Sequence, residues 1–176
     1  IYAHINLKSN QTKIDFTHNW FEKHLKTIII NYKKAPFYND YIWFFEQTYE
    51  KKWNYLTELN EHMLKWLIKE LKINVEFLRA SDFDFEGAKS DLILDICKKL
   101  GAKTFVFGLH GKDYANVKNF ENSGIQIIFQ EYNHPRYKQL YGDFIPNLSV
   151  IDLLFNHGPD SQDIIMSNNI TKEDIS

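Results

Sequence analysis

Residues 89–108 read KSDLILDICKKLGAKTFVFG, and this stretch decides the fold class of the chain. Ser90 to Leu100 carries apolar side chains at helical spacing, and Gly101 follows at the position that commonly lies just past a helix end. Thr104 to Phe107 is a short apolar run of the kind that forms buried strands. A helix followed closely by a strand indicates a domain in which helices and parallel strands alternate.

The flanking segments continue this alternation. Val75 to Arg79 is expected to be extended, Val117 to Asn122 helical, and Ile125 to Gln130 extended again. Crossover connections through helices place neighbouring strands parallel, with a right-handed path. We therefore predict an α/β fold with three mutually parallel strands, forming a small parallel sheet with flanking helices in Rossmann-like βαβ units.

The N-terminal half of the chain adds a helical segment to this sheet. Apolar stripes predict helices that begin near Phe21, near Phe37 and at a cap formed by Thr57. Ile1 to Leu7 alternates apolar and polar residues as a half-buried strand does, and Lys13 to Phe16 continues the pattern after a polar turn.

Near the C-terminus, Ser149 is expected to cap a short helix through Phe155, and Gly158 marks its end. The side chains at the centre of the apolar stripes are expected to be buried. They are Phe21, Leu25, Ile28, Leu67, Ile96 and Leu154.

The composition is that of an ordinary globular protein. The chain has 176 residues, of which 44% are hydrophobic, and this length fits one domain. Its net charge of -2 gives little support to nucleic-acid binding. The apolar runs are far shorter than the roughly 20 residues of a membrane-spanning helix. Cys97 is the only cysteine and no H-E-x-x-H motif is present, so we expect no metal site and a reducing, cytoplasmic setting.

We expect a single domain over residues 1–166 and a polar tail over residues 167–176. The chain opens at Ile1 in the middle of a predicted strand, so we expect its natural start to lie further upstream.

Ligands of open α/β sheets bind outside the carboxyl ends of the strands, which singles out three polar segments. The first contains Arg79, Lys89 and Ser90, and Ser90 is placed at a helix start, where backbone N–H groups favour an anion. The alternative is a helix cap with a solvated charged loop, and the frequency of such caps favours it.

The second segment is GLHGKDY, residues 108–114. Its glycines allow backbone to approach a ligand, and its candidate ligand-binding or catalytic side chains are His110, Lys112, Asp113 and Tyr114. The spacing is not that of a phosphate-binding Walker loop, and a turn without function explains the glycines equally well.

The third segment joins His134, Arg136, Tyr137 and Gln139 to Asp152 on the following helix. Only two of the 21 basic residues are arginines, and both follow a predicted strand end. Arginine has a planar fork for carboxylate or phosphate that lysine lacks, although an arginine in an internal salt bridge would have the same sequence pattern.

The strand ends lead to a geometric prediction. Because parallel strands place their carboxyl ends on one edge, Arg79, Ser90, Lys112, His134 and Arg136 are expected to border one concave surface.

Four blocks of sequence, taken in order, resemble the WbqC-like protein family, whose bacterial members are often associated with surface-polysaccharide gene clusters. The blocks are NWFEKHLKTIIINYKKAPFYNDY, LTELNEHMLKWLIKELKI, KSDLILDICKKLGAKTFVFG with GKDY after it, and YNHPRYKQLYGDFIPNLSVIDLLFNHG. The resemblance runs from about Trp20 to Gly158. Members usually begin with a further strand, a turn and a helix, and we expect that opening, with any part of the site it supplies, to be missing before Ile1.

The resemblance implies a sugar-modifying role, with glycine transfer onto an amino sugar as one form of it. We expect a cytoplasmic transferase that acylates the amine of a nucleotide-linked sugar, with His134 as base, Asp152 or Asp113 orienting it, and Arg79, Lys112 or Arg136 holding the nucleotide. One alternative is a non-catalytic protein that binds a sugar nucleotide or a partner enzyme. Another is a nucleotidyl-transfer enzyme with a magnesium-bound phosphate. The sequence identifies no cofactor and no oligomeric state.

Overall fold

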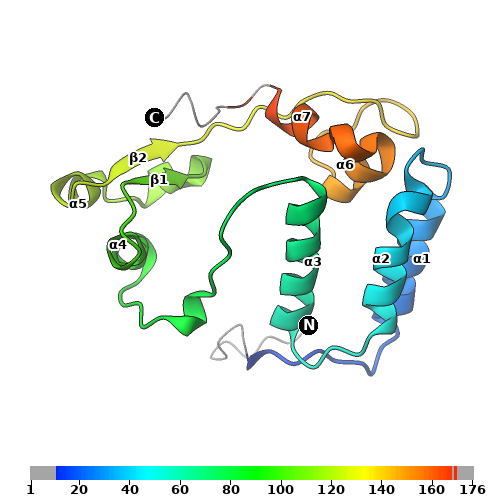
Figure 1. Cartoon of the computed structure of the whole chain (residues 1–176), viewed down its shortest axis with the longest axis horizontal. Helices are drawn as coiled ribbons and strands as arrows, with labels where there is room; N and C mark the ends of the chain where they lie inside the picture. Colours follow the sequence, from blue (N-terminus) through cyan, green and yellow to red (C-terminus); the bar gives the residue numbers. More distant parts are fainter. Residues whose placement is uncertain (1–10, 168, 170–176) are drawn as a thin grey trace. The chain divides into compact units, whose positions relative to one another are not determined.

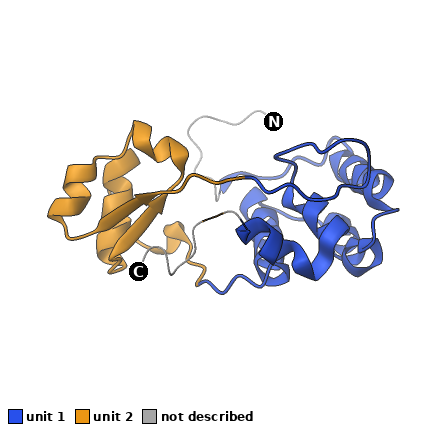
Figure 2. Cartoon of the chain, turned by 90° about the horizontal axis from the view of Figure 1, so that it is seen from above, with its two compact units in different colours: residues 1–75, 134–167 blue, residues 76–133, 168–176 orange. Residues whose placement is uncertain are grey.

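A computed structural model describes residues 11–167 and 169 of the chain, so the strand predicted for Ile1 to Leu7 lies outside the described residues. The chain divides into two compact units (Figure 2). Unit 1 contains the described residues up to Val75 together with His134–Ser167, and unit 2 contains Glu76–Asn133 and the residue described beyond Ser167. The single domain expected for residues 1–166 stays a prediction.

Unit 1 is helical. Its helices are α1 (Trp20–Tyr32), α2 (Tyr38–Glu50), α3 (Leu56–Glu70), α6 (Val150–His157) and α7 (Ser161–Met166). In Figure 1, α1 and α2 lie side by side, and α2 also packs on α6.

Aromatic side chains fill the core of unit 1. The Phe155 ring of α6 stacks on Tyr32 at 4.8 Å, and the Phe44 ring of α2 stacks on Trp66 of α3 at 4.0 Å. Phe45 and Leu154 are each 1% exposed between these stacks. The core therefore joins segments that are more than 100 residues apart in the chain.

Two helix ends in unit 1 have clear local causes. Ala35 and Pro36 end α1, and the next backbone N–H, of Phe37, donates to the Phe155 carbonyl at 3.0 Å. Gly158 ends α6 with φ of 54°, and a β-carbon there would overlap the Phe37 ring. The predicted end of the last apolar helix at Gly158 is confirmed.

The predicted start of α3 is wrong by two residues, because the cap position is Tyr55 and not Thr57. Lys13 forms an isolated antiparallel bridge with Tyr55, which keeps that residue extended, and the Glu58 carboxylate accepts the Tyr55 N–H at 3.2 Å. The helix therefore begins at Leu56. A strand was predicted over Lys13 to Phe16, and of these residues only Lys13 forms a strand-like bridge within the described part of the chain.

Unit 2 contains a parallel pair of strands, β1 (Thr104–Phe107) and β2 (Gln126–Phe129), with Thr104 opposite Gln126. The helix α5 (Val117–Asn122) connects them, as expected, and α4 (Lys89–Lys99) precedes β1. The core of the unit consists of Leu94, Cys97, Phe107, Phe120 and Ile125. Burial raises the pKa of the Cys97 thiol, which fits the expected structural role of this residue.

The third strand is wrong: among the described residues, Val75 to Arg79 pairs with no other strand. Val75 and Leu78 are 57% and 44% exposed, whereas a strand inside a parallel sheet would bury both side chains. Two parallel strands joined by a helix agree with the α/β class, but Rossmann-like units are not confirmed.

Burial was predicted correctly for Ile28 and Leu154 only. Phe21, Leu25, Leu67 and Ile96 are half-buried. They lie at the margin of their stripes, and larger aromatic side chains occupy the centres of the cores.

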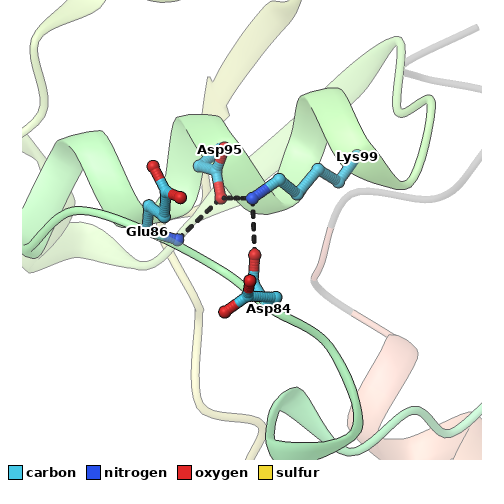
Figure 3. A network of polar contacts seen from close by, with 4 residues as sticks. All are labelled: Asp84, Glu86, Asp95 and Lys99. Carbon is cyan, nitrogen blue, oxygen red and sulfur yellow. Dashed lines mark hydrogen bonds and ion pairs between the residues drawn. The ribbon is translucent and has the colours of Figure 1, made fainter.

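The charged loop before α4 is held against that helix by polar contacts (Figure 3). The Asp95 carboxylate accepts the Glu86 N–H at 2.8 Å and pairs with Lys99 at 2.9 Å, and Lys99 also donates to the Asp84 carbonyl at 2.5 Å. The hydrogen bond from Glu86 and the neighbouring Lys99 hold the pKa of Asp95 below its usual value. Part of this loop is thus structural.

No helix within the described part of the chain is long and apolar enough to cross a membrane.

Candidate functional site

The predicted site residues fall into the two units. His134, Arg136, Tyr137, Gln139 and Asp152 belong to unit 1. Arg79, Lys89, Ser90, His110, Lys112, Asp113 and Tyr114 belong to unit 2. The single concave surface bordered by members of both groups stays a prediction.

In unit 1 the centre of the site is Asp152, which is buried on α6 with 5% exposure. The Tyr137 hydroxyl donates to its Oδ2 at 3.0 Å, and the Asn156 amide donates to its backbone carbonyl at 2.8 Å. Burial and the nearby negative charge of Asp152 raise the pKa of the Tyr32 hydroxyl far above its usual value. The Tyr137 hydroxyl and the Asn156 amide therefore serve one buried carboxylate, and the role of this pair in a ligand site stays a prediction.

His134 is committed to the backbone of its own loop. Its Nε2 accepts the Asn147 N–H at 3.1 Å, so Nδ1 carries the proton and donates to the Pro135 carbonyl at 2.9 Å. The oxygens of Asp152 are bonded to Tyr137 and Asn156 instead. His134 can act as a base only after the bond to Asn147 breaks.

Gln139 closes the same loop. Its Nε2 donates to the Ile145 carbonyl and its Oε1 accepts the Ile145 N–H, both at 2.8 Å. His157 of α6 contacts the Lys138 carbonyl through Nε2 at 2.9 Å. These bonds hold residues 134–148 in a defined conformation without regular secondary structure.

Arg136 is exposed on this loop. Its guanidinium lies 4.8 Å from the centre of the Phe144 ring, and Phe144 in turn packs on Tyr137 at 5.5 Å between centroids. Within the described residues no carboxylate forms an ion pair with Arg136. Arg136 is therefore not used in a salt bridge with another described residue, which was the alternative explanation for this arginine.

In unit 2 the loops after β1 and β2 converge as predicted. Lys112, in the 3-10 helix Leu109–Asp113, pairs with Glu131 at 2.6 Å. The hydrogen bond from Lys112 holds the pKa of Glu131 below its usual value. The ammonium of Lys112 is therefore already paired, and an anionic ligand must displace the Glu131 carboxylate to reach it.

The loop after β1 also carries His110 and Asp113, which face each other at 3.5 Å. The two side chains are 93% and 75% exposed, so their attraction is weak. Gly111 allows this loop to lie on the strand, because a β-carbon there would come within 2.5 Å of the Phe107 Cβ. Tyr114 packs on the same Phe107 ring at 6.0 Å.

Ser90 lies in the first turn of α4, which begins at Lys89, so its predicted place at a helix start is right, but it is not the cap residue. The cap position is Ala88, Ser90 is 8% exposed, and its hydroxyl accepts the Asn116 N–H at 2.9 Å. Its oxygen therefore joins α4 to the start of α5. Lys89 is exposed with φ of 50°, and Arg79 is exposed at the start of the 3-10 helix Ala80–Asp82.

The structure adds functional neighbours that the sequence did not reveal. Tyr32 lies at the end of α1 and reaches Asp152 only through tertiary packing, so no local pattern predicts it. Phe144, Asn147 and His157 lie inside the polar and aromatic stretch after Glu131, which was the available signal for them. Among the described residues, no group of three or more His, Cys, Asp or Glu side chains is placed to hold a metal ion.

The helical unit, the parallel strand pair and the intervening loops define a mixed α/β protein with a polar loop site. The chain belongs to the WbqC-like protein family, whose model matches residues 3–164. It is 28% identical over 160 residues to the uncharacterized protein Rv1507c of Mycobacterium tuberculosis, covering 90% of this chain and 69% of that protein. No solved structure matches the chain significantly.

Proposed function

We propose that this protein binds a nucleotide-linked amino sugar and modifies its amine by acyl or glycyl transfer, in bacterial surface-polysaccharide assembly. Family membership supports the class, and the geometry around α6 supports the binding step. We also keep the cytoplasmic location as part of this proposal, because Cys97 is a buried free thiol and the chain has no other cysteine.

The observation that carries the proposal is the exposed guanidinium of Arg136, which lies over the Phe144 ring, close in sequence to Tyr137 and its buried partner Asp152. The contact with the Phe144 ring restrains the guanidinium, and its N–H groups can bind the two oxygens of a phosphate. A diphosphate bound there would place the attached sugar on the surface of the loop.

The Tyr137–Asp152 pair offers a proton acceptor for the transfer. When the amine attacks the acyl carbon, the Tyr137 oxygen takes the amine proton and passes its own proton to Asp152 Oδ2, which lies 3.0 Å away. As the new amide bond forms, the bond between the acyl carbon and the thioester or ester donor breaks, and the released thiol or alcohol takes up the proton that Asp152 received. This assignment replaces His134 as the base, since both of its ring nitrogens are bonded to the backbone.

Calorimetric titration with UDP-, GDP- and dTDP-linked amino sugars tests the binding step. Arg136→Lys should weaken binding about tenfold despite keeping the charge, because the bidentate fork is lost. Lys26→Arg is the control, since it makes the reverse exchange at an exposed basic residue of α1 outside the candidate site, and it should bind as the wild type does. Equal affinities of the wild type and Arg136→Lys would remove Arg136 from the site.

A non-catalytic binding protein is the second candidate. It is favoured by the hydrogen bonds of His134 and Gln139 to the backbone of their own loop. Side chains bonded in this way hold the loop in shape for recognition and are not available for proton transfer. Incubation with nucleotide-linked amino sugars and aminoacyl or acyl donors, followed by mass spectrometry, distinguishes the two. A product that requires Tyr137 supports transfer, whereas binding without any product supports the second candidate.

A further inference from the structure

A groove of about 420 Å³ crosses the surface of α2 and α3 in unit 1. Its aromatic lining comes from Trp43, Phe44, Trp53 and Trp66. None of these residues belongs to the loop site around Arg136. The volume is in the range of small-molecule sites, which are usually apolar with a few polar groups.

The aromatic surface is built from stacked rings. Phe44 stacks between Trp66, at 4.0 Å and 6°, and His62, at 5.0 Å and 19°. Trp43 is 46% exposed, and its indole N–H donates to the Asp40 carbonyl at 2.9 Å. An exposed indole anchored in this way presents a fixed apolar face to solvent, which is the part of a site that a ring can stack on.

The polar lining is positively charged. Lys51, Lys65 and Lys69 line the groove, and no aspartate or glutamate does. Lys65 pairs with Glu61 at 2.5 Å, whereas Lys51 and Lys69 form no ion pair within the described part of the chain. Lys65 and Lys69 are one turn apart on α3, about 6 Å along the helix. Two to three ammonium groups therefore surround an aromatic floor, and an anion would relieve their mutual repulsion.

The floor and wall also contain polar groups close to these cations. The Lys51 ammonium lies 3.8 Å from the centre of the Trp53 ring. Burial and the nearby Lys51 hold the pKa of His62 below its usual value. Trp66 is 8% exposed, and its buried indole N–H has no hydrogen-bond acceptor among the described residues. Of the three lysines that line the groove, Lys65 is paired with Glu61, and the charges of Lys51 and Lys69 have no ion-pair partner among the described residues.

We propose that this groove is a second binding site, for a phosphorylated ring compound that stacks on the exposed indole of Trp43 and pairs its phosphate with Lys51 and Lys69. Two classes of compound contain both a ring and a phosphate, namely sugar phosphates and nucleoside monophosphates. Lysine stems that merely cover core aromatic rings would give the same contacts without a ligand, and the variants below separate the two cases.

Tryptophan fluorescence and calorimetry of the full chain test the site with N-acetylglucosamine 1-phosphate and with uridine monophosphate. N-acetylglucosamine and uridine are the uncharged counterparts. We expect at least one phosphorylated compound to bind about tenfold more tightly than its counterpart. The compound that does so identifies the source.

Lys69→Gln and Lys51→Gln should each weaken this binding about tenfold, and Trp43→Ala should abolish it. Lys26→Gln, on the exposed surface of α1, is the matched control and should bind as the wild type does. Arg136→Lys should also bind normally, which separates this site from the proposed function.

Three results would overturn the proposal. The first is that neither phosphorylated compound binds at about 10 mM, which corresponds to less than about 3 kcal/mol of binding free energy. The second is an equal loss of affinity in Lys69→Gln and Lys26→Gln. The third is a loss of binding in Arg136→Lys together with normal binding in Lys69→Gln.

Discussion

Asp152 is the residue on which the unit 1 site depends. It was predicted to orient His134, and it instead accepts a hydrogen bond from Tyr137. The sequence places all three residues within one stretch, but the choice of partner follows from how the loop turns back on α6. Local spacing predicts which side chains are near one another and not which of them are bonded.

Gly111 is a residue whose role follows directly from packing. Replacing it by alanine should destabilise unit 2 by about 1–3 kcal/mol, because the new methyl group overlaps Phe107 next to its backbone. Urea unfolding followed by circular dichroism measures the change.

Gly108→Ala is the matched control for Gly111→Ala. It adds the same methyl group in the same loop, where nothing lies within 4 Å, and its φ of -68° suits alanine. Equal destabilisation by the two substitutions would show that the loop does not pack on Phe107 as described.

His62 should make the stability of the protein depend on pH. Its folded-state pKa is lowered, first by burial and then by Lys51, so the unfolded chain binds the proton more readily. The contribution is fully present above the unfolded pKa of about 6.5 and is lost as the pH falls below it. The unfolding free energy of the wild type should therefore fall more between pH 8 and about pH 5.5 than that of His62→Gln. Parallel curves for the two proteins would contradict this.

Secondary-structure elements were predictable to the extent that they are local. The helix Val117–Asn122 and the end of α6 at Gly158 were predicted correctly, because periodicity and end signals lie within the helix itself. Val75 to Arg79 failed as a strand because a strand needs a partner, and its sequence does not specify one. The short helix α7 was not predicted.

The loop over residues 134–148 was located from sequence, but its internal structure was not. Bonds from His134 and Gln139 to backbone groups up to 13 residues away define its shape. Such bonds have no sequence pattern. Polar side chains that looked available for chemistry are therefore partly used to hold the loop itself.

Tyr137→Phe should weaken the attachment of this loop to α6, which the bond between His157 and the Lys138 carbonyl would still support. Removing the hydroxyl leaves the buried Asp152 carboxylate with one donor fewer, which should cost about 1–3 kcal/mol. Tyr141→Phe is the matched control on the same loop, because Tyr141 is 55% exposed and its change should be within about 0.5 kcal/mol. Urea unfolding followed by tryptophan fluorescence compares the two. A loss in Tyr137→Phe no larger than in the control would mean that the bond to Asp152 does not hold the loop.

At the scale of the whole molecule, the chain has two separate cores, one centred on Phe155 and the other on Phe120. All four tryptophans lie in unit 1, so their fluorescence follows that unit alone. This arrangement allows the predicted single domain to be tested against two independently folding units.

Phe120→Ala should cost about 3–5 kcal/mol in unit 2, where the Phe120 side chain is fully buried. In urea unfolding, we expect Phe120→Ala to lower the urea concentration at which unit 2 unfolds, as seen by circular dichroism. The midpoint of the transition seen by tryptophan fluorescence, which reports on unit 1, should not change. Phe155→Ala, the matched exchange in unit 1, should shift the fluorescence midpoint. If Phe120→Ala shifts both signals equally, the chain unfolds as one cooperative domain.

Hydrogen exchange of the wild type, with and without a saturating nucleotide-linked amino sugar, tests the proposed function most directly. We expect slower exchange over residues 134–148 and the first turn of α6, because the ligand would rest on Arg136 and rigidify a loop that α6 already anchors. At a ligand concentration near the wild-type Kd, the slowing should be much smaller in Arg136→Lys, because binding that is about tenfold weaker leaves most of the variant unoccupied. Unchanged exchange in this loop while the ligand is bound, or slower exchange confined to α2 and α3, would contradict the account.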